Sequence, residues 1–337
     1  KKDSADGRFL MWKITTKAIQ KQPITGTSLG GFPAAYAETQ AEYMASGKAT
    51  EQEKLVAGCP EYAFNEYLQI GLEQGLVGLA LFIGWLGLLF YKGIKNKRYA
   101  CCGGLMSLAI FAFSSYPLQL PEFWVVLIFL GVMSVTPDKD EIRENQAESN
   151  GHRWGKQIFF MGIAILGIGL FWMQKDHYKA YQQWNKAQMF YNNKAYEAAL
   201  EVYEPLYPLL KHKPEFLFEA AQSLSKTGQY EKANEYLERA VLLSSDPMLY
   251  YVMAKNEQCL GEYRQAEKHL LHAIDILPER IYPYYLLMNL YTEPSYFQPA
   301  KLKMAIDSVL TKKPKVESSA IKEMKEKARS MLNNTSI

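Results

Sequence analysis

The amino-acid sequence predicts an all-α fold in which polytopic transmembrane helices precede an α-solenoid of repeated helix pairs. Residues 67–173 contain long apolar runs, whereas residues 174–337 are polar and rich in Lys, Glu, Tyr and Ala. The polar part also repeats with a period near 34 residues, which is typical of stacked helix pairs. We therefore expect an outer loop at residues 1–66, a transmembrane part of about four spans at 67–173, and a repeat domain at 174–337.

Length, charge and cysteine content indicate the number of domains and the kinds of binding site to expect. The 337 residues suffice for about two domains, and the net charge of +3 gives no overall electrostatic reason to expect nucleic-acid binding. The four Cys residues, including adjacent Cys101 and Cys102 in an apolar run, lack the spacing of metal ligands. We expect neither a metal nor a cofactor.

The outer loop begins with an expected amphipathic helix at residues 7–20, capped by Asp6 and ended by Pro23. Residues at helical spacing would form its apolar face: Phe9, Trp12, Thr16 and Ile19. Trp12 and the nearby Lys residues suit a membrane interface, with Arg8 one turn earlier on the same side. A second helical stretch is expected over residues 34–55, with Glu38 and Glu42 on one polar face.

Four apolar stretches are candidate membrane spans: residues 68–90, 99–116, 123–136 and 158–173. A span needs about 17–25 apolar residues, so the first two are long enough and the last two are short. Short spans are accommodated by thinning of the bilayer or by flanking Lys residues that reach the headgroups.

The loop between the first two spans sets the orientation. It carries Lys92, Lys95, Lys97 and Arg98 and no acidic residue, and short basic loops of this kind prefer the cytoplasm. An even number of spans then places residues 1–66 and 174–337 on the same outer face. We expect a multi-pass protein of the bacterial inner membrane, with the N-terminal loop and the C-terminal repeats in the periplasm.

The repeat domain is expected over residues 186–310, with a charged capping helix over 311–337. Two sets of residues align between its units: Tyr196, Tyr230 and Tyr263, and Ala199, Ala233 and Ala266. These units resemble tetratricopeptide repeats; three are clear, and a fourth at residues 287–310 is degenerate. The resemblance implies a concave surface that binds a protein partner.

Three motifs follow one another through the first part of the chain. Gly7, Arg8 and Trp12 form GRxxxW, Pro23 and Gly26 form PxxG, and residues 65–78 read NEYLQIGLEQGLVG at the start of the first span. In order and spacing these motifs resemble the O-antigen ligase and polymerase family of lipid-linked glycan transferases, over residues 7–136.

The resemblance implies a reaction and its partners. Enzymes of this family transfer a glycan from an undecaprenyl-diphosphate carrier to a lipid or protein acceptor at the outer face of the inner membrane, as in lipopolysaccharide biosynthesis. They use neither a metal nor a nucleotide sugar. The family has many more spans, so four spans after an outer loop resemble its C-terminal half, and we expect the chain to be a fragment of a larger enzyme.

The resemblance also implies roles for single residues. Arg8 would hold the departing diphosphate, because a guanidinium binds phosphate oxygens in a bidentate manner and stays charged. The substrate site would include four further residues: Trp12, Asn65, Tyr67 and Glu73. For Asn65 and Glu73 a structural reading stays open, as a helix cap and as a hydrogen-bond partner of the outer loop.

The chain departs from the family at Phe64, where a histidine that would act as the base is common. The five His residues all lie downstream: His152, His177, His212, His269 and His272. Three readings stay open. A carboxylate with a pKa raised by burial is the base (Glu66, Glu61 or Glu38), no base is required, or this copy is inactive.

The main alternative is a non-catalytic, membrane-anchored repeat scaffold in envelope polysaccharide assembly. Phe64 and the missing N-terminal half favour the scaffold, whereas Arg8, Asn65 and Glu73 favour the transferase. A solute transporter is disfavoured, because no span carries a central charge or the sequence pattern of a broken helix.

Overall fold

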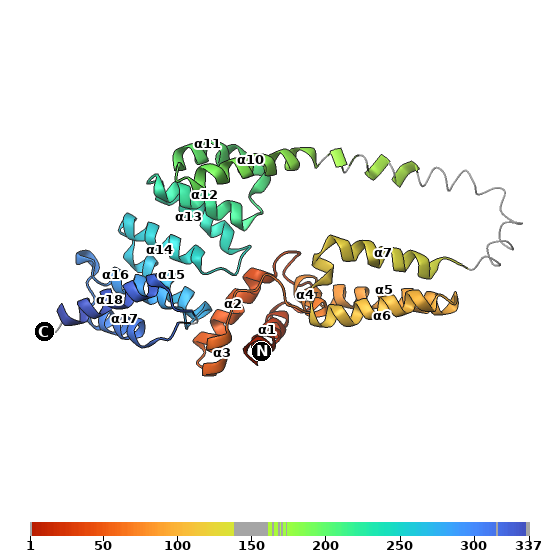
Figure 1. Cartoon of the computed structure of the whole chain (residues 1–337), viewed down its shortest axis with the longest axis horizontal. Coiled ribbons are helices and arrows are strands. Elements are labelled where there is room, and N and C mark those ends of the chain that lie inside the picture. Colours follow the sequence, from red (N-terminus) through yellow and green to blue (C-terminus); the bar gives the residue numbers. More distant parts are fainter. Residues whose placement is uncertain are drawn as a thin grey trace, which may run out of the picture. The chain divides into compact units, whose positions relative to one another are not determined.

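The computed structural model describes residues 2–137, 161–163, 165–167, 169, 171–172, 174–314 and 316–334. All regular secondary structure within these residues is helical, which confirms the all-α class (Figure 1). Contacts divide the chain into a repeat unit, residues 1–18, 30–61 and 183–337, and a membrane unit, residues 19–29 and 62–182. These two units are defined by contacts. The expected domains at residues 1–66, 67–173 and 174–337 are defined by their position relative to a membrane, and they stay a prediction.

The membrane unit contains an apolar helical core. Its elements are α4 (Glu66–Glu73), α5 (Gly75–Lys95), α6 (Tyr99–Ser114), the 3₁₀ turn η1 (Pro117–Gln119) and α7 (Pro121–Val135). Leu89, Leu105 and Leu127 are buried in one cluster, with α5 packed against both α6 and α7. Other large apolar side chains on these helices are exposed, among them Leu81 and Ile110, as is typical of surfaces that contact lipid or a partner.

Within the described residues, α5 alone is long and apolar enough to cross a membrane, with 21 residues. The apolar helices α6 and α7 have 16 and 15 residues. The polytopic part of the expected fold class is therefore not confirmed. The fourth expected span, residues 158–173, lies in part outside the described residues.

The first expected span, residues 68–90, is not one continuous helix. α4 ends at Glu73, Gln74 lies between the two helices, and α5 begins at Gly75 with a φ of +69°. The expected continuous span from residue 68 was therefore wrong at its start, because the long apolar helix begins only at Gly75. The physical reason is the packing of residues 23–28 against the break, described below.

The first helix, α1 (Lys2–Lys21), starts earlier than expected. Asp6 lies inside it and accepts a hydrogen bond from Gln52 Nε2 at 3.1 Å, so the expected capping role of Asp6 was wrong. The face chosen from the sequence was also wrong, because Phe9 is 66% exposed whereas the aliphatic stripe of Leu10, Ile14 and Ala18 is buried. That stripe follows the i, i+4, i+8 spacing of one helical face. The rings of Phe9 and Trp12 meet edge to face at 6.1 Å.

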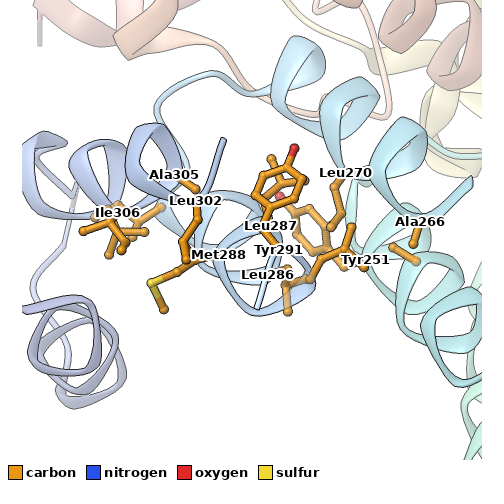
Figure 2. Close-up of a cluster of buried hydrophobic side chains, with 14 of the residues drawn as sticks. Tyr251, Ala266, Leu270, Leu286, Leu287, Met288, Tyr291, Leu302, Ala305 and Ile306 are labelled. Atoms are coloured by element: carbon orange, nitrogen blue, oxygen red, sulfur yellow. The ribbon is translucent and has the colours of Figure 1, made fainter. Parts of the chain in front are cut away.

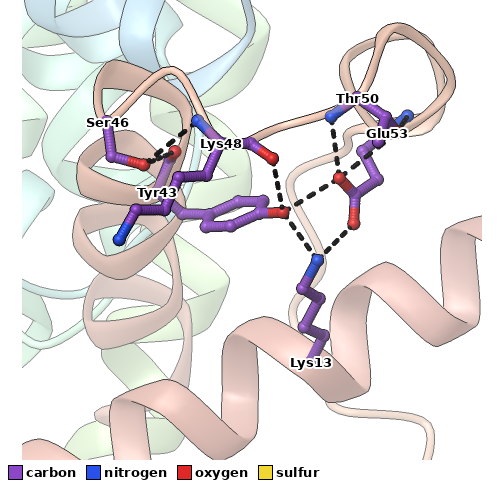
Figure 3. Close-up of polar contacts among 6 residues, drawn as sticks. All are labelled: Lys13, Tyr43, Ser46, Lys48, Thr50 and Glu53. Carbon is purple, nitrogen blue, oxygen red and sulfur yellow. Dashed lines mark hydrogen bonds and ion pairs between the residues drawn. The ribbon is translucent and has the colours of Figure 1, made fainter.

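Within the repeat unit, α1 is tied to two short helices, α2 (Phe32–Ala45) and α3 (Glu51–Val56). Lys13 Nζ donates to the Tyr43 hydroxyl and to Glu53 Oε1, both at 2.6 Å (Figure 3). The Tyr43 hydroxyl donates to Glu53 Oε2 at 2.9 Å, and Thr50 and Glu53 form a capping box at the start of α3. One carboxylate therefore joins three segments of the outer loop.

The remainder of the repeat unit is a stack of helix pairs. In chain order the helices are α10 (Lys175–Asn192), α11 (Tyr196–Leu210), α12 (Pro214–Lys226), α13 (Tyr230–Val241), α14 (Met248–Leu260), α15 (Tyr263–Ile276), α16 (Ile281–Leu290), α17 (Pro299–Thr311) and α18 (Ser319–Asn334). The expected alignment is confirmed, since Ala199, Ala233 and Ala266 are all fully buried at 0% exposure. The small side chains let paired helices approach closely, as in tetratricopeptide repeats.

The fourth repeat is complete despite its irregular sequence. α16 and α17 form its two helices, and Figure 2 shows Leu287, Met288, Leu302 and Ile306 packed in the same cluster as Tyr251 of α14. α18 covers the end of the stack and buries Ala328, as expected for a capping helix.

Candidate functional site

The PxxG motif and the start of the first apolar segment are packed together in the membrane unit. The Thr27 and Ser28 amides donate to the Leu72 and Glu73 carbonyl oxygens, both at 2.9 Å. The Leu76 amide donates to the Pro23 carbonyl oxygen at 2.8 Å. Residues 23–28 therefore bind the last carbonyl groups of α4 and an early amide of α5, which would otherwise lack helical partners.

Glycines allow this close approach of two backbones. A Cβ on Gly75 would lie 2.0 Å from the Ile24 carbonyl oxygen, and a Cβ on Gly26 would lie 2.5 Å from the Glu73 carbonyl group. Both residues have a φ of +69°, which L-residues with a side chain adopt only at a cost. The glycines of the two motifs thus have a packing explanation.

Asn65 begins α4 as its N-cap. Its side-chain oxygen accepts from the Leu68 amide at 3.1 Å, and Asn65 itself is only 4% exposed. The structural reading of Asn65 as a helix cap is therefore realised.

Phe64, just before the cap, has a φ of +50°, in the left-handed region that a bulky side chain seldom adopts. Its ring meets the Tyr116 ring edge to face at 4.8 Å, and Tyr116 stacks on Tyr62 at 5.4 Å. The aromatic contacts hold a strained backbone at this position.

Glu66 is enclosed, with 1% exposure. Oε1 accepts from the Leu118 amide at 2.7 Å, and Oε2 accepts from Gln119 Nε2 at 3.2 Å. Burial raises the pKa of this carboxyl, although these hydrogen bonds favour its charged form. Glu66 therefore joins α4 to the turn η1, and both of its oxygens are already engaged.

The remaining polar residues of α4 are also engaged. Gln69 accepts from the Ala63 amide at 2.8 Å and donates to Glu73 Oε1 at 2.8 Å. The Tyr67 hydroxyl donates to the Ala109 carbonyl oxygen of α6 at 3.0 Å. Asn65, Glu66, Tyr67 and Glu73 thus each form a hydrogen bond to a different neighbour, and together these bonds fix the shape of the segment.

The other candidate residues belong to the repeat unit. Arg8 is exposed on α1, and Trp12 is half-buried one turn later. The Glu38 side chain is 57% exposed on α2, and its Oε2 lies 3.4 Å from His272 Nε2 of α15. Glu61 is exposed.

The position of His272 was not expected from the sequence. His272 also contacts the Tyr250 ring at 4.8 Å, and His269, one turn away, shares a hydrogen bond of 2.9 Å with the buried Glu257. Both histidines are thus packed against neighbouring side chains of the repeat unit. No local sequence signal could have placed His272 beside Glu38, because the two helices are far apart in the chain.

The arrangement separates two kinds of residue. Asn65, Glu66 and Glu73 are buried and hydrogen-bonded, so they can stabilise the local fold but are not exposed to a ligand. Arg8 and Glu38 are exposed and can meet a ligand. Within the described residues no group of three or more His, Cys, Asp or Glu side chains could hold a metal ion.

Models of known protein families match two parts of the chain. Residues 1–83 match the model of a family described as O-Antigen ligase, which confirms the resemblance to that family over this segment. Residues 192–273 match the model described as Anaphase-promoting complex, cyclosome, subunit 3. No curated protein matches the chain.

Solved structures of repeat proteins are similar to part of the chain. A MamA protein is 17% identical, with a TM-score of 0.38, and the match covers 46% of this chain and 89% of that one. MamA from Desulfovibrio magneticus RS-1 is 20% identical, with a TM-score of 0.38 and coverages of 47% and 93%. A putative kinesin light chain of Podosopora anserina, with nearly identical TPR-like repeats, is 16% identical, with a TM-score of 0.36 and coverages of 47% and 93%.

Proposed function

We propose that the chain is a membrane glycan-transfer module of the O-antigen ligase type, whose repeats bind a protein partner. It would move a glycan from an undecaprenyl-diphosphate carrier to a lipid or protein acceptor at the periplasmic face of the bacterial inner membrane. The observation that carries the proposal is the match of residues 1–83 to the ligase family, a segment that includes Arg8 and both parts of the packed motif.

Arg8 is the residue to which we assign the leaving diphosphate. It is exposed on a helix with two aromatic neighbours, Phe9 and Trp12, which suit the headgroup layer of a bilayer. A guanidinium at that depth would neutralise the charge that develops on the diphosphate as the glycan departs.

Among the carboxylates, Glu38 is the base that we favour. Glu66 is enclosed and bonded through both oxygens, whereas the Glu38 carboxylate is exposed beside the His272 ring. A carboxylate and an imidazole in contact can share the proton of an incoming hydroxyl group. Trp12 would contact the substrate, whereas Asn65, Tyr67 and Glu73 would keep the ligase motif in shape without taking part in proton transfer.

The test uses the purified protein in nanodiscs with a synthetic undecaprenyl-diphosphate-linked oligosaccharide. Arg8→Lys keeps the positive charge but removes the planar fork, and Arg8→Ala removes both. We expect transfer to fall about tenfold in the first variant and about a hundredfold or more in the second. The matched control is Lys17→Ala, a change of another exposed cation on α1. Unchanged transfer in Arg8→Ala would exclude the role of Arg8.

A second candidate function, the repeat scaffold without catalysis, is favoured by Phe64. It predicts that deletion of the repeats abolishes polysaccharide assembly while Arg8→Ala leaves it intact. The two variants, compared in one strain with membrane levels of the protein measured in parallel, separate the candidates.

A further inference from the structure

The repeat unit contains a groove of about 960 Å³ whose wall comes from two distant parts of the chain. Phe218, Tyr251 and Tyr282 of the repeats line it with aromatic surface. Cys59 and Glu61 line it as well, and these belong to the outer loop just before Asn65.

Buried hydrogen bonds hold the loop in this wall. Gln40 of α2 is fully buried, and its Nε2 donates to the Gly58 carbonyl oxygen at 3.0 Å and to the Ile276 carbonyl oxygen at 2.8 Å. Its Oε1 accepts from the Tyr36 hydroxyl at 2.8 Å. Two of these bonds join α2 to the loop and to the end of α15, and the third, within α2, orients the amide.

A second contact lies at the far end of the same segment. Ser245, between α13 and α14, donates through its Oγ to the Pro60 carbonyl oxygen at 3.2 Å. Residues 58–60 are thus bound at one end by α2 and at the other end by the repeats. A buried, satisfied hydrogen-bond network of this kind fixes one arrangement, so the loop is a built part of the groove.

The groove carries an excess of negative charge. Glu61, Glu215, Glu219 and Asp246 line it, against the single cation Arg280.

The partners of Glu219 strengthen this point. Its carboxylate accepts from Trp184 Nε1 at 2.7 Å, Gln188 Nε2 at 2.9 Å and the Tyr203 hydroxyl at 3.0 Å. These three donors are neutral, so they orient the carboxylate without cancelling its charge.

We propose that this groove takes an extended, positively charged segment of a partner polypeptide, which lies against residues 59–61 as well as the repeats. Lys or Arg side chains would pair with the acidic residues and lie over the Tyr251 and Tyr282 rings. The structure already contains one such contact, with Lys255 Nζ 5.2 Å from the centre of the Tyr282 ring. The inference rests on the proposed protein-binding role of the repeats and is independent of glycan transfer.

One consequence is that the partner would touch both functional parts at once. Residues 59–61 lead directly into Asn65 and α4. An occupant of the groove would therefore contact the segment that matches the ligase family, residues 1–83, as well as the repeats.

The test measures binding to the full chain in detergent. The probe is a fluorescent peptide in which Lys alternates with Leu and Tyr, and the reference peptide has Glu at every Lys position. We expect the Lys peptide alone to bind and to slow alkylation of the Cys59 thiol, followed by mass spectrometry. Glu215→Lys and Glu61→Lys should each weaken binding about tenfold, whereas Glu238→Lys on α13, outside the groove, should leave it unchanged.

Three outcomes would overturn the proposal. Equal binding of the Glu peptide would remove the charge argument. A bound Lys peptide that leaves the alkylation rate of Cys59 unchanged would show that the loop is not part of the site. Protection of Cys59 by a neutral oligosaccharide, but not by the peptide, would identify the groove as a glycan site instead. Because no transfer reaction is measured, the first two results overturn this proposal without bearing on glycan transfer.

Discussion

Lys13 of α1 and Glu53 of α3 are joined by an ion pair of 2.6 Å that also includes the Tyr43 hydroxyl. Burial disfavours the charged form of Glu53. Even so, hydrogen bonds from Lys13, the Thr50 amide and Tyr43 lower its pKa to about 2. The hydrogen bonds that Lys13 donates to Glu53 and to the Tyr43 hydroxyl, the former with the larger effect, raise the pKa of Lys13. The two charges therefore stabilise the folded outer loop over the whole neutral range.

The sign of the pH dependence follows from the carboxylate. A lowered pKa gives stability that is present above about pH 4.5 and is lost as the pH falls towards about 2. We expect Glu53→Gln to lower the stability of the outer loop by about 1–2 kcal/mol at pH 7, because the ion pair with Lys13 is lost while Gln can still complete the capping box. The difference from the wild type should shrink at pH 3. Thermal unfolding followed by tryptophan fluorescence measures both.

Glu51→Gln is the matched control for this prediction. Glu51 pairs with Lys54 on the surface of α3 and is 86% exposed, so its replacement should leave the thermal unfolding unchanged. Equal effects of the two variants would contradict a special role of Glu53.

The second prediction concerns the break between α4 and α5. Gly75→Ala would place a Cβ 2.0 Å from the Ile24 carbonyl oxygen, at a φ of +69°. We expect a cost of about 2–4 kcal/mol and faster hydrogen exchange at the Thr27 and Ser28 amides, which depend on this packing. Gly84→Ala, in the same helix with no atom within 4 Å of its Cβ, should change neither. Unchanged exchange in Gly75→Ala would mean that the two segments are not packed as described.

The third prediction separates the cap from a chemical role of Asn65. Asn65→Ser keeps an oxygen that can accept from the Leu68 amide, whereas Asn65→Ala removes it at a cost of about 1 kcal/mol. If Asn65 acts as a cap, transfer measured in nanodiscs should be kept in the Ser variant and reduced in the Ala variant. Loss of transfer in both, with α4 still folded by hydrogen exchange, would point to direct contact between the amide and the substrate.

The fourth prediction uses Phe64. His and Asn both tolerate a positive φ better than Phe, but only His can accept a proton near neutral pH. We expect Phe64→His to raise transfer about tenfold or more if proton removal limits the reaction, and Phe64→Asn to give no gain. Both variants lose the same ring contact with Tyr116, so that contact cannot explain a difference. Equal rates would leave Glu38 as the base or show that none is needed.

Part of this molecule can be predicted from the sequence. The alignment of Ala199, Ala233 and Ala266 predicts the repeat core, because small residues at a fixed period report helix contacts directly. The cap at Asn65 follows from a local rule. In contrast, the break at Gln74 depends on residues 23–28, and the neighbours of Glu38 depend on α15. These contacts join segments distant in the chain, and local periodicity does not encode them.

The apolar face of α1 was missed for a related reason. Phe9 and Trp12 dominate any measure of hydrophobicity, but Leu10, Ile14 and Ala18 are the residues that are buried. Aromatic residues outside the core are typical where a helix meets a membrane interface or a partner. Composition alone does not distinguish such a surface from a core.

The bond from Gln40 to Ile276 also has a consequence for biosynthesis. The two residues are 236 positions apart, so Gln40 leaves the ribosome long before its partner exists. At about 5–20 residues per second, the wait is on the order of 10–50 s. During that time the membrane helices are made, while Tyr36, Ala37 and Ala41 of α2 remain without the surface that will cover them. α2 is thus synthesised before the repeats that cover it, and it acquires its final contacts only after α15 has formed.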